Sequence, residues 1–285
     1  MLWNRLSSKF RRQSAQIERA HADGLAVNED SPEAFEEILW RKYFDHKHTA
    51  SGISLWSTAD SNFVTYFREH MQKIVLARQP GHLKEGRYVS KNNNNVGRIP
   101  ALQDMVSDAL IVVPVRDPLE HAISLWSQHQ NFSRRQASDP FVRKYMEDIG
   151  HYEFGTLHRP IKFPSVGVLT EDRSPDSIDY WLAYWIAAFE HLSACEGIVF
   201  LSYESLCRSP VESVTQLSRQ LCIRATGSEI EDAASMLRGA TPSRKHVHST
   251  DKELSERAMF VYRELLCCCL PVGAYHTNAN RTADA

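Results

Sequence analysis

The feature that most constrains the fold is the segment Ile111–Trp126, IVVPVRDPLEHAISLW. It begins with a short apolar run rich in valine and isoleucine, which is typical of a buried strand. Asp117 is a natural helix N-cap and Pro118 suits the first helical position, so a helix is expected directly after the strand. The segment therefore predicts a strand, a tight turn and a helix in succession, with Arg116 at the tip of the strand.

Other compact apolar runs have the same character as this strand. We expect buried parallel strands at Arg87–Ser90, Leu110–Val115 and Ile198–Ser202. Polar residues follow each run, and the carboxyl ends of parallel strands form the ligand-binding edge of an open sheet. The sequence thus predicts that Lys91, Arg116 and Tyr203 lie at one edge.

Apolar residues at helical spacing predict helices around these strands. The predicted helices are Leu2–Ile17, one starting at Ser31, Asp60–Arg78, Pro140–Ile149, one around Trp181–Leu192, 211–221, 228–237 and 251–270. Three of these helices precede the first strand, and residues 132–176 otherwise predict a mobile loop region. The expected fold class is α/β, a parallel sheet flanked by helices. We expect a single domain, 1–285, in which residues 1–80 form a helical N-terminal region and residues 86–270 form a nucleotide-binding core.

Composition limits the possible partners. The chain has 33 basic and 35 acidic side chains, so its formal charge is 33 − 35 = −2. This balance argues against a nucleic-acid-coating surface and makes any anion site local. No apolar run is long enough to cross a bilayer, so no membrane partner is expected. The six cysteines show no CxxC spacing, which favours reduced thiols and a cytoplasmic location.

Arg116 and Ser124 are the strongest candidates for a binding site. A helix N-terminus attracts anions, an arginine at the preceding turn offers a bidentate fork, and a serine on the returning helix adds a hydroxyl donor. Together they predict a phosphate clamp. The alternative is that Arg116 pairs with Asp117 or another acid, and that Ser124 is a small packing residue.

The segment that contains this clamp, RDPLEHAIS, resembles the 3′-phosphate-binding segment of sulfotransferases, which has an arginine followed by a serine eight positions later. Three other segments are similar to that family: YVSKNNNNVGRIP, YWLAYWIAAFEHLSACEGIVFLSYESL and SRKHVHST, the last of which resembles the nucleotide loop of tyrosylprotein-type members. The resemblance covers residues 30–265 and is strongest for 86–126. It implies the P-loop-type sulfotransferase fold and the donor 3′-phosphoadenosine-5′-phosphosulfate as co-substrate.

The resemblance also implies roles for individual residues. Arg116 and Ser124 would hold the 3′-phosphate, and Lys91 would stabilise charge on the leaving phosphate. Tyr203 would approach the adenine, and Lys245 would close over the nucleotide. The alternatives are a surface lysine at 91, a structural tyrosine at 203 and a solvated loop charge at 245.

The acceptor and the general base are less well defined by the sequence. The acceptor would be a hydroxyl or amine on a small molecule, carbohydrate or peptide. Glu37 is the preferred catalytic base, with Glu36, His46 and His48 as further candidates, although a solvated helix face also explains both glutamates. His46 and His48 have an HxH spacing, but no third ligand is evident, so no metal is expected.

One family feature is missing from the sequence. The family's Pro-x-Ser-Gly-Thr-Thr loop, which cradles the 5′-phosphosulfate, has no counterpart among the 285 residues. We therefore expect an N-terminally truncated sulfotransferase with weak nucleotide binding and little activity. The alternatives are a non-catalytic nucleotide-binding remnant and a nucleotide kinase-like enzyme, which would need a Gly-x-x-x-x-Gly-Lys loop that the sequence lacks.

Overall fold

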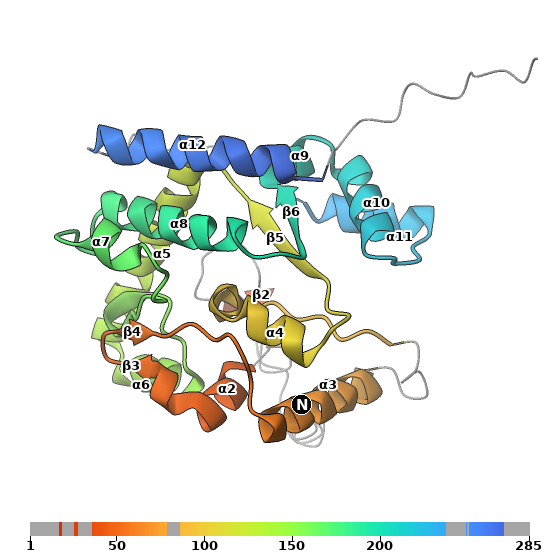
Figure 1. Ribbon diagram of the computed structural model, residues 1–285, viewed down its shortest axis with the longest axis horizontal. Coiled ribbons are helices and arrows are strands. Elements are labelled where there is room, and N and C mark those ends of the chain that lie inside the picture. The colour runs from red at the N-terminus through yellow and green to blue at the C-terminus, as the bar shows by residue number, and fades with distance from the viewer. Residues whose placement is uncertain are drawn as a thin grey trace, which may run out of the picture. The chain divides into compact units, whose positions relative to one another are not determined.

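The computed structural model describes residues 17–18, 26–27, 36–78, 86–237, 249 and 251–270. The described residues are mostly helical, and they contain one parallel sheet of two strands (Figure 1). The α/β class therefore holds in this coarse form.

Internal contacts divide the chain into unit 1, residues 1–107 and 125–167, and unit 2, residues 108–124 and 168–285. The single-domain organisation stays a prediction.

Unit 1 is built mainly from helices. It contains β1 (Ile17–Glu18), β2 (Ala26–Val27), α2 (Glu36–Phe44), η1 (Asp45–Lys47), β3 (His48–Thr49), β4 (Gly52–Ile53), α3 (Ser61–Arg78), η2 (Asn93–Gly97), α4 (Ile99–Met105), α6 (Pro140–Ile149) and η3 (Gly155–Leu157). The helices α5 (Pro118–Ser138) and α7 (Val166–Thr170) run from one unit into the other. The short strands pair in antiparallel hairpins, β1 with β2 and β3 with β4, and Ile53 of β4 also forms a parallel bridge with Ile161.

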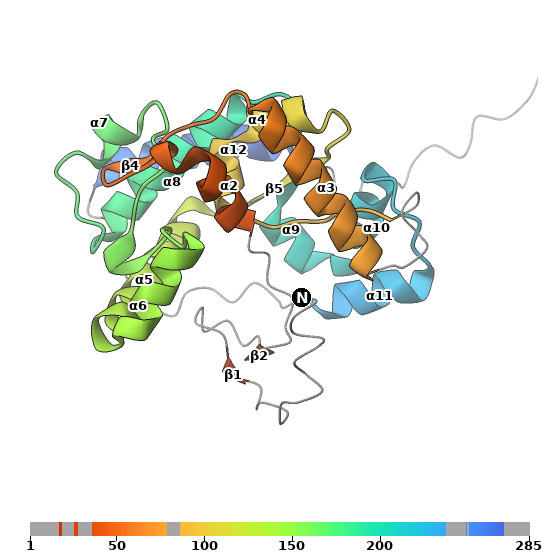
Figure 2. The ribbon, with the colours of Figure 1, turned by 90° about the horizontal axis from the view of Figure 1, so that it is seen from below.

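An aromatic cluster forms the core of unit 1. The rings of Trp40 on α2 and Phe63 on α3 have centroids 4.5 Å apart, and Trp40 also lies 5.6 Å from Phe67. Figure 2 shows the two helices that carry these residues, α2 and α3. Asp60 begins α3, because its Oδ1 accepts the backbone N–H of Phe63 at 3.3 Å. The helix predicted for residues 60–78 is confirmed.

Unit 2 contains the parallel sheet. Its elements are β5 (Ile111–Val115), α8 (Ile178–Ser193), β6 (Ile198–Ser202), α9 (Tyr203–Arg208), α10 (Pro210–Gln220), α11 (Gly227–Ser235) and α12 (Lys252–Cys268). β5 and β6 pair in parallel, and Val115 lies opposite Ser202 at the end of the ladder. Two of the three predicted strands are thereby confirmed, as are the helices near 181–192, 211–221, 228–237 and 251–270.

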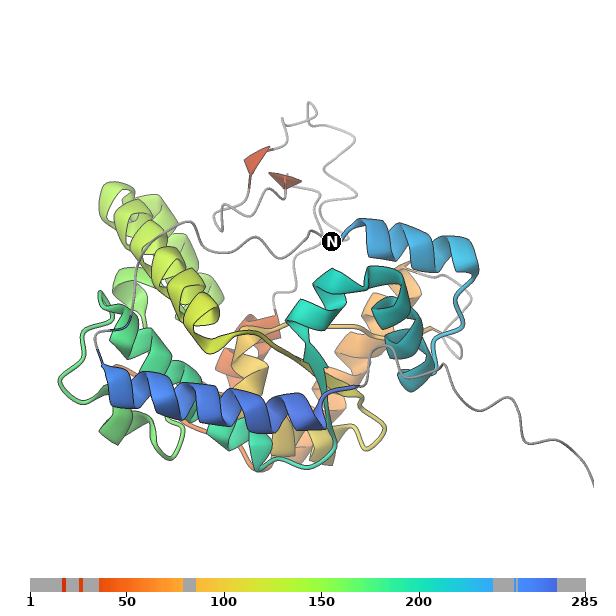
Figure 3. The ribbon, with the colours of Figure 1, turned by 90° about the horizontal axis from the view of Figure 1, so that it is seen from above.

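Two long helices pack together in unit 2, and one of them, α12, also contacts β5 and β6. α8 buries Trp181 and Trp185 almost completely, each with 1% of its surface exposed. α12, the long blue helix in Figure 3, packs against α8 and buries Leu254, Ala258 and Leu265. The apolar stripes predicted for these segments thus form the core of the unit.

The predicted strand Arg87–Ser90 is not present. Residues 86–90 have no regular secondary structure, and the side chain of Val89 is 87% exposed. Tyr88 instead donates its hydroxyl hydrogen to the carboxylate of Glu36. A strand needs both a paired neighbour and a buried face, and this segment has neither, so Lys91 does not stand at a strand end.

Two further expectations need correction. Residues 132–176 are largely structured, because 132–138 continue α5 and the buried rings of Phe132 and Phe154 lie 5.8 Å apart. The helix Pro140–Ile149 within this region is confirmed. Ile17, expected on a helix, lies in β1. The short strands β1 to β4 come before α3, so the expectation that three helices precede the first strand is wrong. The rest of the expected first helix lies outside the described residues.

Candidate functional site

The carboxyl edge of the parallel sheet carries two of the predicted residues. Because Val115 and Ser202 lie opposite each other, Arg116 and Tyr203 leave the sheet at the same edge. The Arg116 guanidinium carbon lies 5.1 Å from the centroid of the Tyr203 ring, a cation–π contact. The structure therefore brings these two residues together, as the strand pattern predicted.

The turn after β5 has the predicted helix start. Asp117 Oδ1 accepts the backbone N–H of Glu120 at 3.0 Å, and α5 begins at Pro118, so the N-cap is confirmed. Arg116 Nη2 lies 3.3 Å from Glu120 Oε2. The arginine thus pairs with an acid of the helix, though with Glu120 and not with Asp117.

Ser124 lies two helical turns beyond Asp117. Residues four apart share one face of a helix, so Ser124 lies on the face that carries Glu120, toward which the Arg116 side chain extends. Ser124 is half-buried. The convergence of Arg116 and Ser124 on one anion stays a prediction.

His121 lies on α5 close to this turn, and the sequence predicts a satisfied or exposed histidine there. Its ring centroid lies 6.3 Å from that of Phe189, and its buried Nδ1 has no hydrogen-bond partner within the described chain. Loss of solvent around the ring, followed by the nearby Arg116 guanidinium, lowers the pKa of His121 to about 4. The ring is therefore neutral at pH 7, and it lies close to the positive charge of Arg116.

Glu204 of α9 forms hydrogen bonds both with this turn and with α12. Asp117 donates its backbone N–H to Glu204 Oε1 at 2.9 Å, and the Tyr262 hydroxyl of α12 donates to Glu204 Oε2 at 2.9 Å. Burial and the carboxylate of Glu204 raise the pKa of Tyr262. No pattern in the sequence signals Tyr262, because it lies 58 residues from its partner on an ordinary amphipathic helix.

The predicted residues divide between the two units. Arg116, Ser124 and Tyr203 belong to unit 2, whereas Lys91 and Glu37 belong to unit 1. Lys91 is exposed and precedes η2. Lys245 lies outside the described residues. That the predicted residues of unit 1 and those of unit 2 come together at one site stays a prediction.

Glu37 lies in a buried network of unit 1. Its carboxylate forms an ion pair with Arg98 and accepts hydrogen bonds from His48 Nε2 at 2.9 Å and from Asn92 Nδ2 at 3.0 Å. The expectation of a solvated helix face is wrong, because Glu36 and Glu37 are only 2% and 8% exposed.

The environment of Glu37 also opposes a role as a base. Burial by itself would raise the pKa of Glu37, but the Arg98 charge and the hydrogen bonds from His48, Arg98 and Asn92 together lower it to about 2. A carboxylate with so low a pKa and both oxygens engaged is a weak proton acceptor. The geometry therefore favours a structural role for Glu37.

Arg98 is the cation at the centre of this network. Its guanidinium carbon lies 4.2 Å from the ring centroid of Trp40 and 5.3 Å from that of Trp56. Its Nε and Nη1 make no hydrogen bond within the described residues, and the two indole rings stabilise the guanidinium charge by cation–π contact. Sequence reasoning missed Arg98, because its partners come from distant segments.

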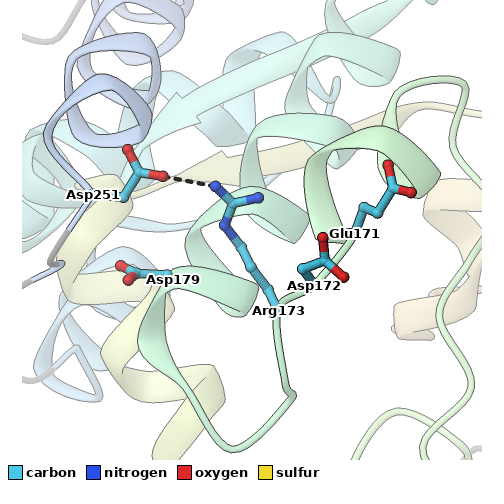
Figure 4. Close-up of a pocket in the computed structure, with 5 residues that line it drawn as sticks. All are labelled: Glu171, Asp172, Arg173, Asp179 and Asp251. Atoms are coloured by element: carbon cyan, nitrogen blue, oxygen red, sulfur yellow. Dashed lines mark hydrogen bonds and ion pairs between the residues drawn. The ribbon is translucent and has the colours of Figure 1, made fainter.

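A surface pocket in unit 2 is lined by charged residues outside the predicted set: Glu171, Asp172, Arg173, Asp179 and Asp251 (Figure 4). Arg173 Nη2 donates to Asp251 Oδ2 at 2.7 Å, and Asp251 Oδ1 accepts the N–H of Leu254 at 2.9 Å, so Asp251 caps α12. Asp179 accepts the Ser249 hydroxyl at 2.6 Å. The carboxylates of Asp179 and Asp251 therefore already have partners.

Three further findings bear on the kind of site. Within the described ranges, no group of three or more His, Cys, Asp or Glu side chains is arranged to hold a metal. No helix among the residues that the structure describes combines the length and apolarity needed to cross a bilayer. All six cysteines are free thiols.

The chain was compared with protein-family models, with curated proteins and with solved structures, and none of them matched.

Proposed function

We propose that the chain is a sulfotransferase that transfers a sulfuryl group from 3′-phosphoadenosine-5′-phosphosulfate to a hydroxyl or amine acceptor. The observation that carries the proposal is the meeting of Arg116 and Tyr203 at the carboxyl edge of β5 and β6. Nucleotide ligands bind at this edge in open parallel sheets. The proposal includes the P-loop-type sulfotransferase fold and a cytoplasmic location.

In this proposal, Arg116 recognises the 3′-phosphate. Its side chain is 25% exposed and its Glu120 partner 30% exposed, so water can solvate both charges when the pair separates. The guanidinium then forms a bidentate pair with the phosphate, and the Ser124 hydroxyl donates a further hydrogen bond. Because His121 is neutral, it adds no second positive charge beside Arg116.

The proposal gives the remaining predicted residues supporting roles. Tyr203 lies beside the adenine, Lys91 stabilises charge on the leaving phosphate, and Lys245 covers the nucleotide. The proposal does not use Glu37 as the base, because Arg98, His48 and Asn92 already engage its carboxylate. The acceptor is a small molecule, carbohydrate or peptide.

A non-catalytic nucleotide-binding protein is the second candidate function. It is favoured by a property of the sequence, which contains no Pro-x-Ser-Gly-Thr-Thr segment to hold the 5′-phosphosulfate. Such a protein would keep the Arg116 edge and bind the nucleotide without transferring sulfate.

Calorimetry followed by a transfer assay tests the proposal. We expect adenosine 3′,5′-bisphosphate to bind roughly tenfold or more tightly than adenosine 5′-monophosphate, because only the former presents a 3′-phosphate to Arg116. Transfer of labelled sulfate to a hydroxyl or amine acceptor would then support the sulfotransferase. Binding without transfer would favour the second candidate, and equal affinities for both nucleotides would contradict both.

A further inference from the structure

The two residues that follow β6 contact the two residues that follow β5. Tyr203 lies against the Arg116 guanidinium, and Glu204 Oε1 accepts the backbone N–H of Asp117 at 2.9 Å. The side chain and the backbone of the β5 turn are thus fixed by the first two residues of α9, the helix that follows the partner strand β6. This double contact goes beyond the pairing of the strands themselves, which ends at Val115 and Ser202.

A third element orients Glu204. The Tyr262 hydroxyl donates to Glu204 Oε2 at 2.9 Å, so each carboxylate oxygen has one donor and the donors come from different elements. Ser202 fixes the backbone beneath, since its hydroxyl oxygen accepts the N–H of Ser205 at 3.2 Å and caps α9. The carboxylate is therefore held from two sides.

The position of Glu204 excludes a direct role in binding an anion. A carboxylate repels phosphate, and Glu204 already occupies the Asp117 amide, one of the free donors at the start of α5. Any contribution of Glu204 to anion binding must therefore come from the way it holds the neighbouring backbone. By fixing the amide of Asp117, it limits the directions in which the side chain of the preceding residue can leave the backbone.

We propose that Glu204 is a positioning residue that presents Arg116 to a nucleotide phosphate, and that Tyr262 orients Glu204 for this purpose. This inference rests on the proposed function. It assigns to Glu204 and Tyr262 a role in phosphate recognition that neither residue performs by touching the phosphate.

The test compares variants of the full chain in calorimetric titrations with adenosine 3′,5′-bisphosphate. Glu204→Ala removes both hydrogen bonds and should weaken binding roughly tenfold. Glu204→Gln keeps an oxygen for the Asp117 amide and removes the charge, so its affinity should stay within about threefold of the wild type. Rescue by glutamine separates positioning from charge: if the carboxylate only repelled phosphate, both variants would bind more tightly.

Tyr262→Phe provides an independent arm, because it removes a hydroxyl without changing the Asp117 contact. It should weaken binding about threefold, and it keeps the proposal testable if Glu204→Ala does not fold. Glu264→Ala is the matched control, since Glu264 is an exposed glutamate of the same helix α12. Melting temperatures measured in parallel identify any variant whose affinity falls through unfolding.

The outcomes distinguish this inference from the proposed function. If Arg116→Ala weakens binding while Glu204→Ala and Tyr262→Phe bind like the wild type, the positioning role is wrong and the proposed function stands. If the wild-type chain does not bind the bisphosphate, the proposed function fails and the positioning role fails with it. Weaker binding in Glu204→Ala that Glu204→Gln restores would support the proposal.

Discussion

Arg98 in unit 1 and Arg116 in unit 2 have the same kinds of partner, a glutamate and an aromatic ring, but they differ in exposure. Arg98 pairs with Glu37 beside two indole rings, and its side chain is 0% exposed. Arg116 pairs with Glu120 beside one phenol ring, and its side chain is 25% exposed. The comparison teaches that burial decides whether an arginine can exchange its partner.

The physical reason is the cost of leaving a charge without water or a counter-ion. Separating a buried pair leaves both ions desolvated, whereas a partly exposed pair contributes roughly 0–1 kcal/mol and each ion regains water. Arg98 is therefore confined to a structural role. Under the proposed function, Arg116 leaves Glu120 for a phosphate.

The largest expected effect is on the buried arginine. Arg98→Met should lower the free energy of unfolding of unit 1 by roughly 3–5 kcal/mol, because Glu37 stays buried without its cation. Urea denaturation measures this effect, with hydrogen exchange of α2 and α3 as the readout. Arg134→Met, at an exposed arginine of α5, is the control and should change stability by about 0.5 kcal/mol or less. A similar small effect for Arg98→Met would break the comparison.

Acid should release the same pair. The pKa of Glu37 is about 2 in the folded chain, below its ordinary value of 4.5. The stabilisation is therefore complete above about pH 4.5 and is lost as the pH falls toward 2, a change on the order of 3 kcal/mol. Urea midpoints measured across this range should fall more in the wild type than in Glu37→Gln. Parallel curves would show that Glu37 titrates normally.

Arg116, which is only partly buried, should matter much less for the stability of the fold. Arg116→Ala should change the free energy of unfolding by about 1 kcal/mol or less, because its pair with Glu120 is partly solvated. The same denaturation experiment, read at α8 and α12, measures it. A loss of about 3 kcal/mol would show that Arg116 is as structural as Arg98.

The smallest expected effect concerns the partner of Arg116. Glu120→Gln should tighten binding of adenosine 3′,5′-bisphosphate roughly two- to threefold, because the carboxylate no longer competes with phosphate for the guanidinium. Calorimetry measures the change, and Glu212→Gln, at an exposed glutamate of α10, is the control. Weaker binding in Glu120→Gln would mean that Glu120 holds Arg116 in place and does not compete.

The elements that the sequence predicts well are those whose cause is local. The β-branched run and the Asp117 cap predict β5 and the start of α5, and parallel pairing then brings Arg116 and Tyr203 to one edge. The Glu37 network was not predicted, because Arg98 lies 61 residues away in the sequence. The false strand at 87–90 has the same cause: only tertiary contacts decide that Val89 faces solvent.

The most direct test of the central claim, that Arg116 binds the 3′-phosphate, is a calorimetric comparison of two nucleotides on the wild type and Arg116→Ala. We predict that the variant binds adenosine 3′,5′-bisphosphate more weakly by roughly 1.5–3 kcal/mol, about ten- to hundredfold. Its affinity for adenosine 5′-monophosphate should be unchanged, so the preference of the wild type for the bisphosphate should disappear. A variant that keeps this preference would contradict the claim.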